Sequence, residues 1–268
     1  MSSPRDLDQR WAGSAATLDD AYRWWSIPRR EVDAPLQLLC FSHAGGAAAA
    51  YVPWAKLLPE FVQLVICQLP GRAARLAEQP IPAIDELAEL VVDSIAALPA
   101  APRVLFGHSM GAVLAFEVGV RLQLDGHDVR GLCVAGSKPP HRMPSGLKLH
   151  RLRGVELIEA VSRTYGGVPP VVLEDPELRE LLAPALQADL EAIETYTFDG
   201  GGPMTCPMAI YGGQSDVHAP PAEMREWARH TTGPATVTLF DGGHFFYREA
   251  AQSAVLRDLS QRLETWRT

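Results

Sequence analysis

The position with the clearest chemical potential is a serine that has a glycine two residues to either side. Residues 107–111 read Gly-His-Ser-Met-Gly, with an apolar run before them and a run of small and apolar residues typical of a helix after them. In a strand–turn–helix setting, this spacing gives a sharp turn that strains the serine backbone and holds its hydroxyl above the sheet at a helix N-terminus. We therefore predict that Ser109 is a nucleophile.

A serine hydroxyl is a weak nucleophile at neutral pH, so it needs a base, and the base needs an orienting acid. His244 lies on a glycine-containing loop just past the expected strand 235–240, and Asp216 follows the expected strand 206–211. In open α/β sheets, reacting groups collect beyond the carboxyl ends of the strands. The chain order Ser109, Asp216, His244 therefore predicts a catalytic triad.

Other side chains compete for these roles. His43 also follows an expected strand and remains an alternative base. His108 is adjacent to Ser109, and from that position its ring cannot easily turn onto the serine oxygen. Asp241 follows a strand as well, but it lies only three residues before His244, and we expect it to cap the turn.

Backbone N–H groups are expected to hold the oxyanion. Residues 43–46, His-Ala-Gly-Gly, follow the first clear strand, 36–42, and glycines there let the backbone approach a substrate carbonyl. One donor should be the N–H of Met110, directly after the nucleophile, and the other the N–H of Ala44. The segment is not a phosphate-binding loop, because no Gly-Lys-Ser or Gly-Lys-Thr follows it.

The composition narrows the class of protein. The 268 residues suffice for one α/β domain with a substantial core, and the net charge of −8 argues against a general binder of nucleic acid or anionic membranes. We see no apolar signal core at the N-terminus and no apolar run long enough to span a bilayer. Each of the four cysteines falls in or beside an expected strand, without metal-ligand spacing, so we expect buried free thiols in the cytoplasm and no metal site.

Apolar runs alternate with helical patterns, which predicts an α/β fold with a mostly parallel central sheet and helices on both faces. Strands are expected at 36–42, 63–68, 103–107, 131–136, 206–211 and 235–240. Helices are expected at 51–59, 84–98, 111–124, 222–231 and 249–266. Residues 1–35 lack clean periodicity, although Trp24 and Trp25 could anchor this segment, and we expect the first few residues to be disordered.

One interval breaks the alternation. From about 138 to 202 there is no strand signal, only helical stretches at 154–164 and 176–198. Because the interval lies between two expected sheet strands, such an insertion would cover the nucleophile as a lid. We therefore expect a single domain over residues 1–268 with a helical lid at about 138–202.

The first part of this interval is basic. Between Ser137 and Val155 there is no acidic residue, and the five cations are Lys138, Arg142, Lys148, Arg151 and Arg153. Such a run is either a solvated face or a docking patch for an acidic partner. If it is a docking patch, Arg142, Lys148 and Arg151 are the residues expected to contact that partner.

With these motifs assembled, the chain resembles the type II thioesterases, the stand-alone editing hydrolases that accompany polyketide and nonribosomal peptide synthetases. The resemblance covers about residues 36–266. It rests on residues 39–46, 68–72, 106–112, 186–189, 211–216 and 243–246. Where the family commonly has a proline, before the His-Ala-Gly-Gly loop, this chain has Ser42.

The resemblance implies an α/β-hydrolase fold, a triad of Ser109, His244 and Asp216, and oxyanion donors at Ala44 and Met110. It implies acyl groups on the phosphopantetheine arm of an acyl or peptidyl carrier protein as substrates, with no cofactor bound by the enzyme itself. Carriers of this kind are generally acidic, which would give the basic stretch a purpose. We also expect a monomer. A carboxylesterase or lipase, and an acyltransferase, remain alternatives on the same fold, and a non-catalytic binding protein is the alternative from another class.

Overall fold

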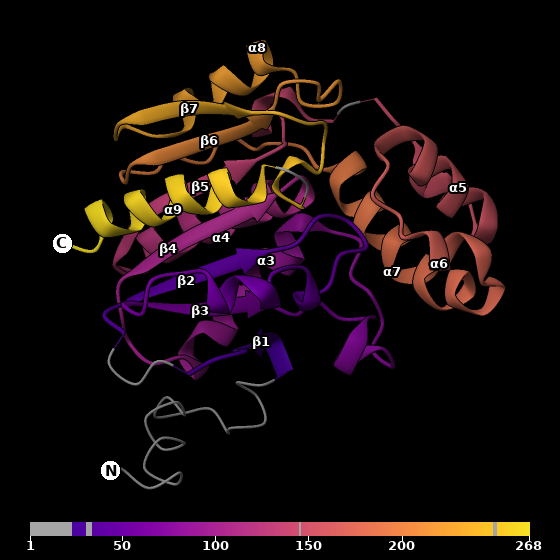
Figure 1. Ribbon diagram of the computed structural model, residues 1–268, viewed down its shortest axis with the longest axis horizontal. Coiled ribbons are helices and arrows are strands. Elements are labelled where there is room, and N and C mark those ends of the chain that lie inside the picture. The colour runs from indigo at the N-terminus through magenta and orange to yellow at the C-terminus, as the bar shows by residue number, and fades with distance from the viewer. Residues whose placement is uncertain (1–22, 31–33, 145, 249–250) are drawn as a thin grey trace, which may run out of the picture.

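The structure, a computed structural model, describes residues 23–30, 34–144, 146–248 and 251–268 (Figure 1). Seven strands form one sheet in the order β1-β3-β2-β4-β5-β6-β7. The strands are β1 (Trp25–Ser26), β2 (Leu36–Phe41), β3 (Val62–Cys67), β4 (Arg103–His108), β5 (Val129–Ala135), β6 (Met208–Gly213) and β7 (Ala235–Phe240). Every neighbouring pair is parallel except β1 with β3, so the expected mostly parallel sheet is confirmed.

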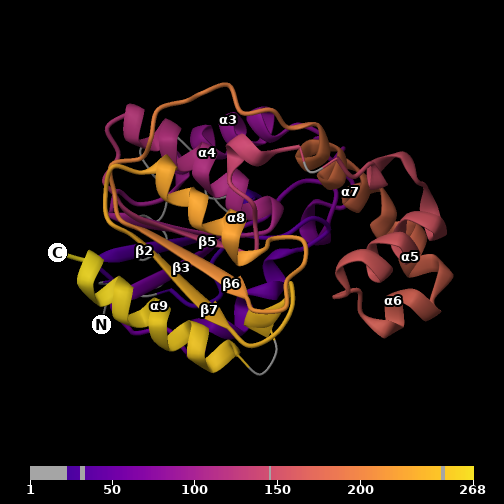
Figure 2. The same cartoon turned by 90° about the horizontal axis from the view of Figure 1, so that it is seen from above.

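Helices cover both faces of the sheet. Figure 2 shows α3 (Ile84–Ser94), α4 (Met110–Leu124) and α8 (Pro221–Met224) on one face and α9 (Gln252–Trp266) on the other. Successive strand residues point to opposite faces. Leu39 and Phe41 of β2 therefore join the core under α3 and α4, whereas Leu38 and Cys40 join the core under α9.

Short 3₁₀ helices connect many of these elements. They are η1 (Ala48–Ala50), η2 (Val52–Lys56), η3 (Ala73–Arg75), η4 (Ile95–Ala97), η5 (Pro140–Arg142), η6 (Leu149–Arg151), η7 (Arg225–His230) and η8 (Phe246–Arg248). The expected helix 51–59 is only the 3₁₀ helix η2. The expected helix 222–231 is α8 followed by η7, because the α-helical part ends after one turn.

The edge strand β1 is a feature that the sequence patterns did not predict. It has two residues, Trp25 and Ser26, which pair with Cys67 and Ile66 of β3. The Trp25 side chain is fully buried, and its indole N–H donates to the Ser94 carbonyl at 3.2 Å. The expected anchoring role of Trp25 is thus confirmed, whereas the expectation for the first residues of the chain lies outside the described residues.

Three further helices lie between β5 and β6 in the chain and beyond the end of the sheet in space (Figures 1 and 2). They are α5 (Gly154–Tyr165), α6 (Pro170–Glu174) and α7 (Pro176–Thr195), and they share a small apolar core that includes Leu157, Val172 and Leu190. The Asp175 side chain caps α7 by accepting from the N–H groups of Glu177 and Leu178. Within the described ranges, none of the helices combines the length and the apolar character that crossing a bilayer requires.

Candidate active site

Ser109 occupies the turn between β4 and α4. Its backbone has φ 57° and ψ −121°, a region that residues with a side chain rarely adopt, so the turn is strained. The flanking glycines are required by close packing. A Cβ on Gly107 would lie 2.0 Å from the Gly111 carbonyl oxygen, and one on Gly111 would lie 2.3 Å from the Phe41 carbonyl oxygen. The motif therefore has the strand–turn–helix geometry that its spacing predicts.

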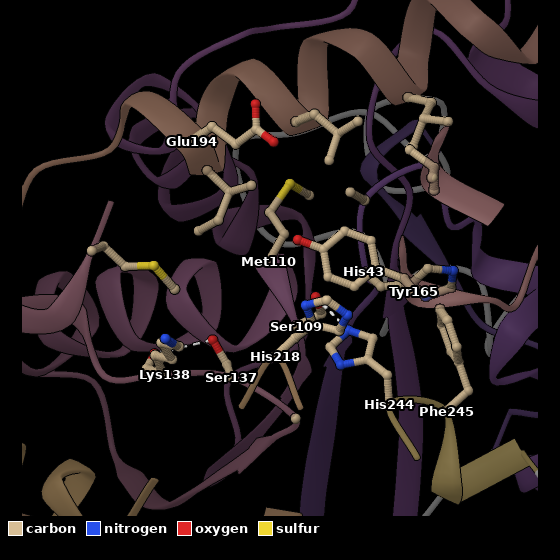
Figure 3. A pocket seen from close by; sticks show the side chains of 17 residues that line it. His43, Ser109, Met110, Ser137, Lys138, Tyr165, Glu194, His218, His244 and Phe245 are labelled. Atoms are coloured by element: carbon tan, nitrogen blue, oxygen red, sulfur yellow. Dashed lines mark hydrogen bonds between the residues drawn. The ribbon is translucent and has the colours of Figure 1, made fainter. Parts of the chain in front are cut away.

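The three residues of the predicted triad lie together, although 135 positions separate Ser109 from His244. The Ser109 Oγ lies 3.0 Å from the His244 Nε2, and the His244 Nδ1 lies 2.9 Å from the Asp216 Oδ2. Asp216 lies in the loop after β6 and His244 in the loop after β7, while Figure 3 shows His244 beside Ser109. The carboxyl ends of three parallel strands bring the side chains to one point.

The Asp216 carboxylate is fixed on both of its oxygens. The Oδ1 accepts from the backbone N–H groups of His218 and Ala219 at 2.9 and 3.2 Å, and the Oδ2 faces His244. Burial alone would raise the pKa of Asp216, but the hydrogen bonds and the charge of His244 lower this pKa below its ordinary value. The ionised carboxylate accepts the Nδ1–H of His244, which leaves the Nε2 free to accept the hydroxyl proton of Ser109.

The two rival histidines point elsewhere. Burial lowers the pKa of His108 well below its usual range, and its Nε2–H donates to the backbone carbonyl of His244 at 2.7 Å. The ring of His108 therefore holds the loop that carries His244. Burial also lowers the pKa of His43, whose Nε2 lies 3.5 Å from a guanidinium nitrogen of Arg248 and makes no hydrogen bond to Ser109.

The predicted oxyanion donors both face the cavity that contains Ser109. In the part of the chain that the structure describes, neither the N–H of Ala44 nor that of Met110 has a protein acceptor. Residues 43–46 form a tight turn that is closed by a 2.8 Å bond from the Gly46 N–H to the His43 carbonyl. Gly45 has φ +72° in this turn, which is the conformation that position i+2 of a type II turn requires.

The α5–α7 segment forms one wall of this cavity of about 80 Å³. The Tyr165 ring, at the end of α5, lies 5.2 Å from the His244 ring, and burial raises the pKa of Tyr165 to about 12. A second cavity of about 260 Å³ lies against the same segment, with a mainly apolar lining and Arg248 among its residues. The His218 Nε2–H donates to the Thr164 carbonyl at 2.6 Å and so ties α5 to the loop that carries Asp216.

The basic stretch is partly neutralised by acids from another part of the chain. The Nζ of Lys138 lies 2.9 Å from Glu223, and the guanidinium of Arg142 lies 2.6 Å from Glu226. Because the Glu226 carboxylate also lies 3.1 Å from Arg229, it offsets the charge of Arg142 only in part. Lys148 and Arg151 are exposed beside α7 and have no acidic partner among the described residues.

The four cysteines are buried and unpaired. Burial raises the pKa of both Cys67 and Cys206 to about 12, so these thiols stay protonated at neutral pH. Across the described ranges, no group of three or more histidine, cysteine or acidic side chains is arranged to hold a metal ion.

Comparison with known proteins adds an independent line of evidence. The family model for the thioesterase domain matches residues 36–263. Thioesterase PikA5 of Streptomyces venezuelae is 35% identical over 234 residues, which cover 86% of this chain and 82% of the relative. The gramicidin S biosynthesis protein GrsT of Aneurinibacillus migulanus is 30% identical over 235 residues, covering 87% of this chain and 91% of the relative.

Solved structures agree with the sequence matches. The type II thioesterase BorB from the borrelidin biosynthetic cluster superposes with a TM-score of 0.83 at 37% identity, covering 90% of this chain and 97% of BorB. The matched region extends from β2 into α9 and includes Ser109, Asp216, His244 and both predicted oxyanion donors. The chain therefore belongs to the thioesterase domain family and has the α/β-hydrolase fold of its type II members.

Proposed function

We propose that this thioesterase hydrolyses acyl groups from the phosphopantetheine arm of an acyl or peptidyl carrier protein, with Ser109 as the nucleophile. The observation that carries the proposal is the continuous hydrogen-bonded chain from Ser109 through His244 to Asp216, at 3.0 and 2.9 Å. The family supports the thioester as the reacting bond, and the relatives named for borrelidin and gramicidin S biosynthesis support a role in such pathways.

The proposed reaction has two half-reactions. The Ser109 Oγ attacks the thioester carbonyl carbon while the His244 Nε2 takes the hydroxyl proton, and Asp216 stabilises the resulting imidazolium. The intermediate then expels the pantetheine thiolate, which receives the proton from His244, and leaves an acyl ester on Ser109. In the second half-reaction, His244 takes a proton from water, the hydroxide attacks the ester, and the acid product leaves as Ser109 regains its proton.

In both half-reactions a negative charge develops on the carbonyl oxygen. The backbone N–H groups of Ala44 and Met110, which have no acceptor in the described part of the protein, would bind that oxygen. Loss of one such donor typically lowers kcat by about 10²–10³-fold. These two donors are therefore expected to contribute a large share of the rate enhancement.

We further propose that the α5–α7 segment is a lid inserted into a single hydrolase domain. Tyr165 of α5 and Leu186 and Leu190 of α7 line the cavity above Ser109, so the segment would shield the acyl-enzyme from bulk water. The exposed Lys148 and Arg151 at the edge of this lid offer positive charge to an acidic carrier protein. The unpaired thiols suit a cytoplasmic enzyme, and we expect it to act as a monomer.

The proposal is tested by comparing kcat/KM for one acyl group presented as a carrier thioester, as a pantetheine thioester and as a matched oxygen ester. We expect the carrier thioester to be the best substrate and Ser109→Ala to abolish turnover with its circular dichroism spectrum unchanged. A preference for the oxygen ester would assign the protein as a carboxylesterase. Transfer of the acyl group to an added amine or alcohol instead of water would assign it as an acyltransferase.

A further inference from the structure

A buried ion pair joins the lid to the body of the protein. Asp189 of α7 is 1% exposed, and Arg72, in the loop after β3, is 3% exposed. The guanidinium donates to both carboxylate oxygens, with Nη1–Oδ2 at 2.5 Å and Nη2–Oδ1 at 2.7 Å. The two residues belong to the segments 68–72 and 186–189 that mark the family resemblance, and the triad mechanism gives neither of them a task.

Both members of this pair also bind the turn that carries Ala44. The Asp189 Oδ2 accepts the N–H of Gly45 at 2.7 Å, and the Arg72 Nη1 donates to the carbonyl of Gly46 at 3.1 Å. The turn is thus held through a backbone donor by one partner and through a backbone acceptor by the other. Ion pairs that only join two elements do not need such contacts.

The bond to Gly45 fixes the peptide between Ala44 and Gly45, which directly follows the peptide whose N–H is the predicted oxyanion donor. In a tight turn, the peptide between positions i+1 and i+2 has opposite orientations in type I and type II. Here that peptide joins Ala44 to Gly45, and its N–H is the group that Asp189 accepts. Leu186, one turn earlier on α7, packs on the same glycine, because a Cβ there would lie 2.9 Å from the leucine Cδ1.

We propose that Asp189, held in place by Arg72, is a positioning residue that sets the orientation of the Ala44 N–H for the oxyanion. This inference rests on the proposed function, in which Ala44 is an oxyanion donor. It makes the rate of the reaction depend on the docking of the lid helix α7, since a displaced α7 would release the turn. The hydrogen bonds from Arg72 keep the carboxylate directed at Gly45.

Asp189→Asn is the substitution that tests this role with the least change in volume. The Oδ2 accepts from two donors, Gly45 N–H and Arg72 Nη1, so the amide oxygen takes that place, and the NH₂ group then faces the Arg72 Nη2 as donor against donor. Arg72 and the turn that it binds through Gly46 must therefore shift. A misplacement of about 1 Å near the reacting atoms can cost about 10²-fold in rate. We therefore expect kcat with a carrier thioester to fall by about 10–100-fold while KM stays within about twofold.

Tyr196→Phe provides a matched control. The Tyr196 hydroxyl, just past the end of α7, donates to the buried Glu117 of α4 at 2.6 Å, so this change also removes a buried link between α7 and the body of the protein. It touches neither Gly45 nor Arg72. We expect it to lower the melting temperature while leaving kcat within about twofold of the wild type.

Two inhibitors separate positioning from general loosening of the pocket. The Ser109 Oγ adds to the carbonyl carbon of a trifluoromethyl ketone analogue of the acyl-pantetheine, while His244 takes the hydroxyl proton. The adduct then carries a negative oxygen in the oxyanion site. The corresponding thioether binds without reacting. For Asp189→Asn we expect the affinity for the ketone to fall by the same factor as kcat/KM. The affinity for the thioether should stay within about twofold of the wild type. An equal loss of affinity for both inhibitors, or no loss of affinity for either, would overturn the inference.

Arg72→Lys tests the same point if Asp189→Asn does not fold. A lysine keeps the positive charge beside Asp189 but cannot reproduce the two parallel bonds or the contact with Gly46. We expect kcat to fall by less than in Asp189→Asn, and the affinity to fall for the ketone but not for the thioether. Failure of the proposed function would look different, because Ser109→Ala would then retain hydrolysis whatever the result with Asp189 or Arg72.

Discussion

Replacing Asp216 by asparagine should invert the role of His244 without moving it. The Oδ1 position faces the N–H groups of His218 and Ala219, so the amide oxygen of Asp216→Asn must take that place. The amide NH₂ then faces the His244 Nδ1, which must become the acceptor. The imidazole is therefore held with its proton on Nε2, where it meets the Ser109 hydroxyl and cannot take its proton.

The size of the effect follows from two losses. An imidazolium and a carboxylate about 4 Å apart attract each other by about 4 kcal/mol at an effective dielectric constant of about 20, and this attraction is lost. Forcing the productive tautomer against the amide NH₂ costs about 1–3 kcal/mol more. We therefore expect kcat to fall by about 10⁴-fold, at about 1.4 kcal/mol per factor of ten. The same substitution in other serine triads costs about as much.

The assay is the rate of thiol release from an acyl-pantetheine thioester at pH 7, measured for Asp216→Asn and for Asp241→Asn. Asp241 is the neighbouring exposed carboxylate after β7, and its replacement should leave kcat within about twofold. A loss of less than about tenfold in Asp216→Asn would refute the tautomer reasoning. So would a larger loss in Asp241→Asn, which would move the orienting acid to that residue.

Three further outcomes are expected. Gly111→Ala should yield little folded protein on a thermal melt, because the added Cβ would lie 2.3 Å from a backbone oxygen of β2; a normal melting temperature would contradict the packing account. Hydrogen bonds from Arg75 and Arg23 lower the pKa of Glu78 from 4.5 to about 2, so its ion pairs stabilise the fold above about pH 4.5 and are lost as the pH falls to about 2. Glu78→Gln should therefore lower the melting temperature at pH 7 but much less at pH 3. An equal lowering at both pH values would show that the charge of Glu78 is not what stabilises the fold. Reversing the charge of Lys148 and Arg151 together should raise KM for the carrier thioester and not for the pantetheine thioester, whereas reversal at Arg130, at the opposite end of the sheet, should change neither.

The positions of the candidate triad residues could be predicted from the sequence because each prediction depends on local chemistry. The spacing around Ser109 determines the turn, and the strands before Asp216 and His244 are apolar runs with clear ends. A parallel sheet brings its carboxyl ends to one edge, so three distant residues needed no other information to be placed together. The strand before Asp216 nevertheless lies two positions later than predicted, because Gly212 and Gly213 continue its pairing with β7.

The contacts made by the inserted segment could not be predicted in the same way. Asp189 lies 117 positions from Arg72 and 144 from Gly45, and only the docking of α7 brings the three together. Glu226 pairs with Arg142 from 84 positions away, so a count of charge along the chain could not show that part of this charge is offset. The strand β1, with two residues, is too short to show any periodicity.

The central claim, that Ser109 carries the acyl group between the two half-reactions, is tested most directly by mass spectrometry of the quenched enzyme. The protein is mixed with an acyl-carrier thioester, stopped in acid within one turnover and digested. We predict a mass increase equal to the acyl group on the peptide that contains Ser109, and its absence in Ser109→Ala. Thioester hydrolysis by Ser109→Ala, or an acyl group found on a different residue, would contradict the account.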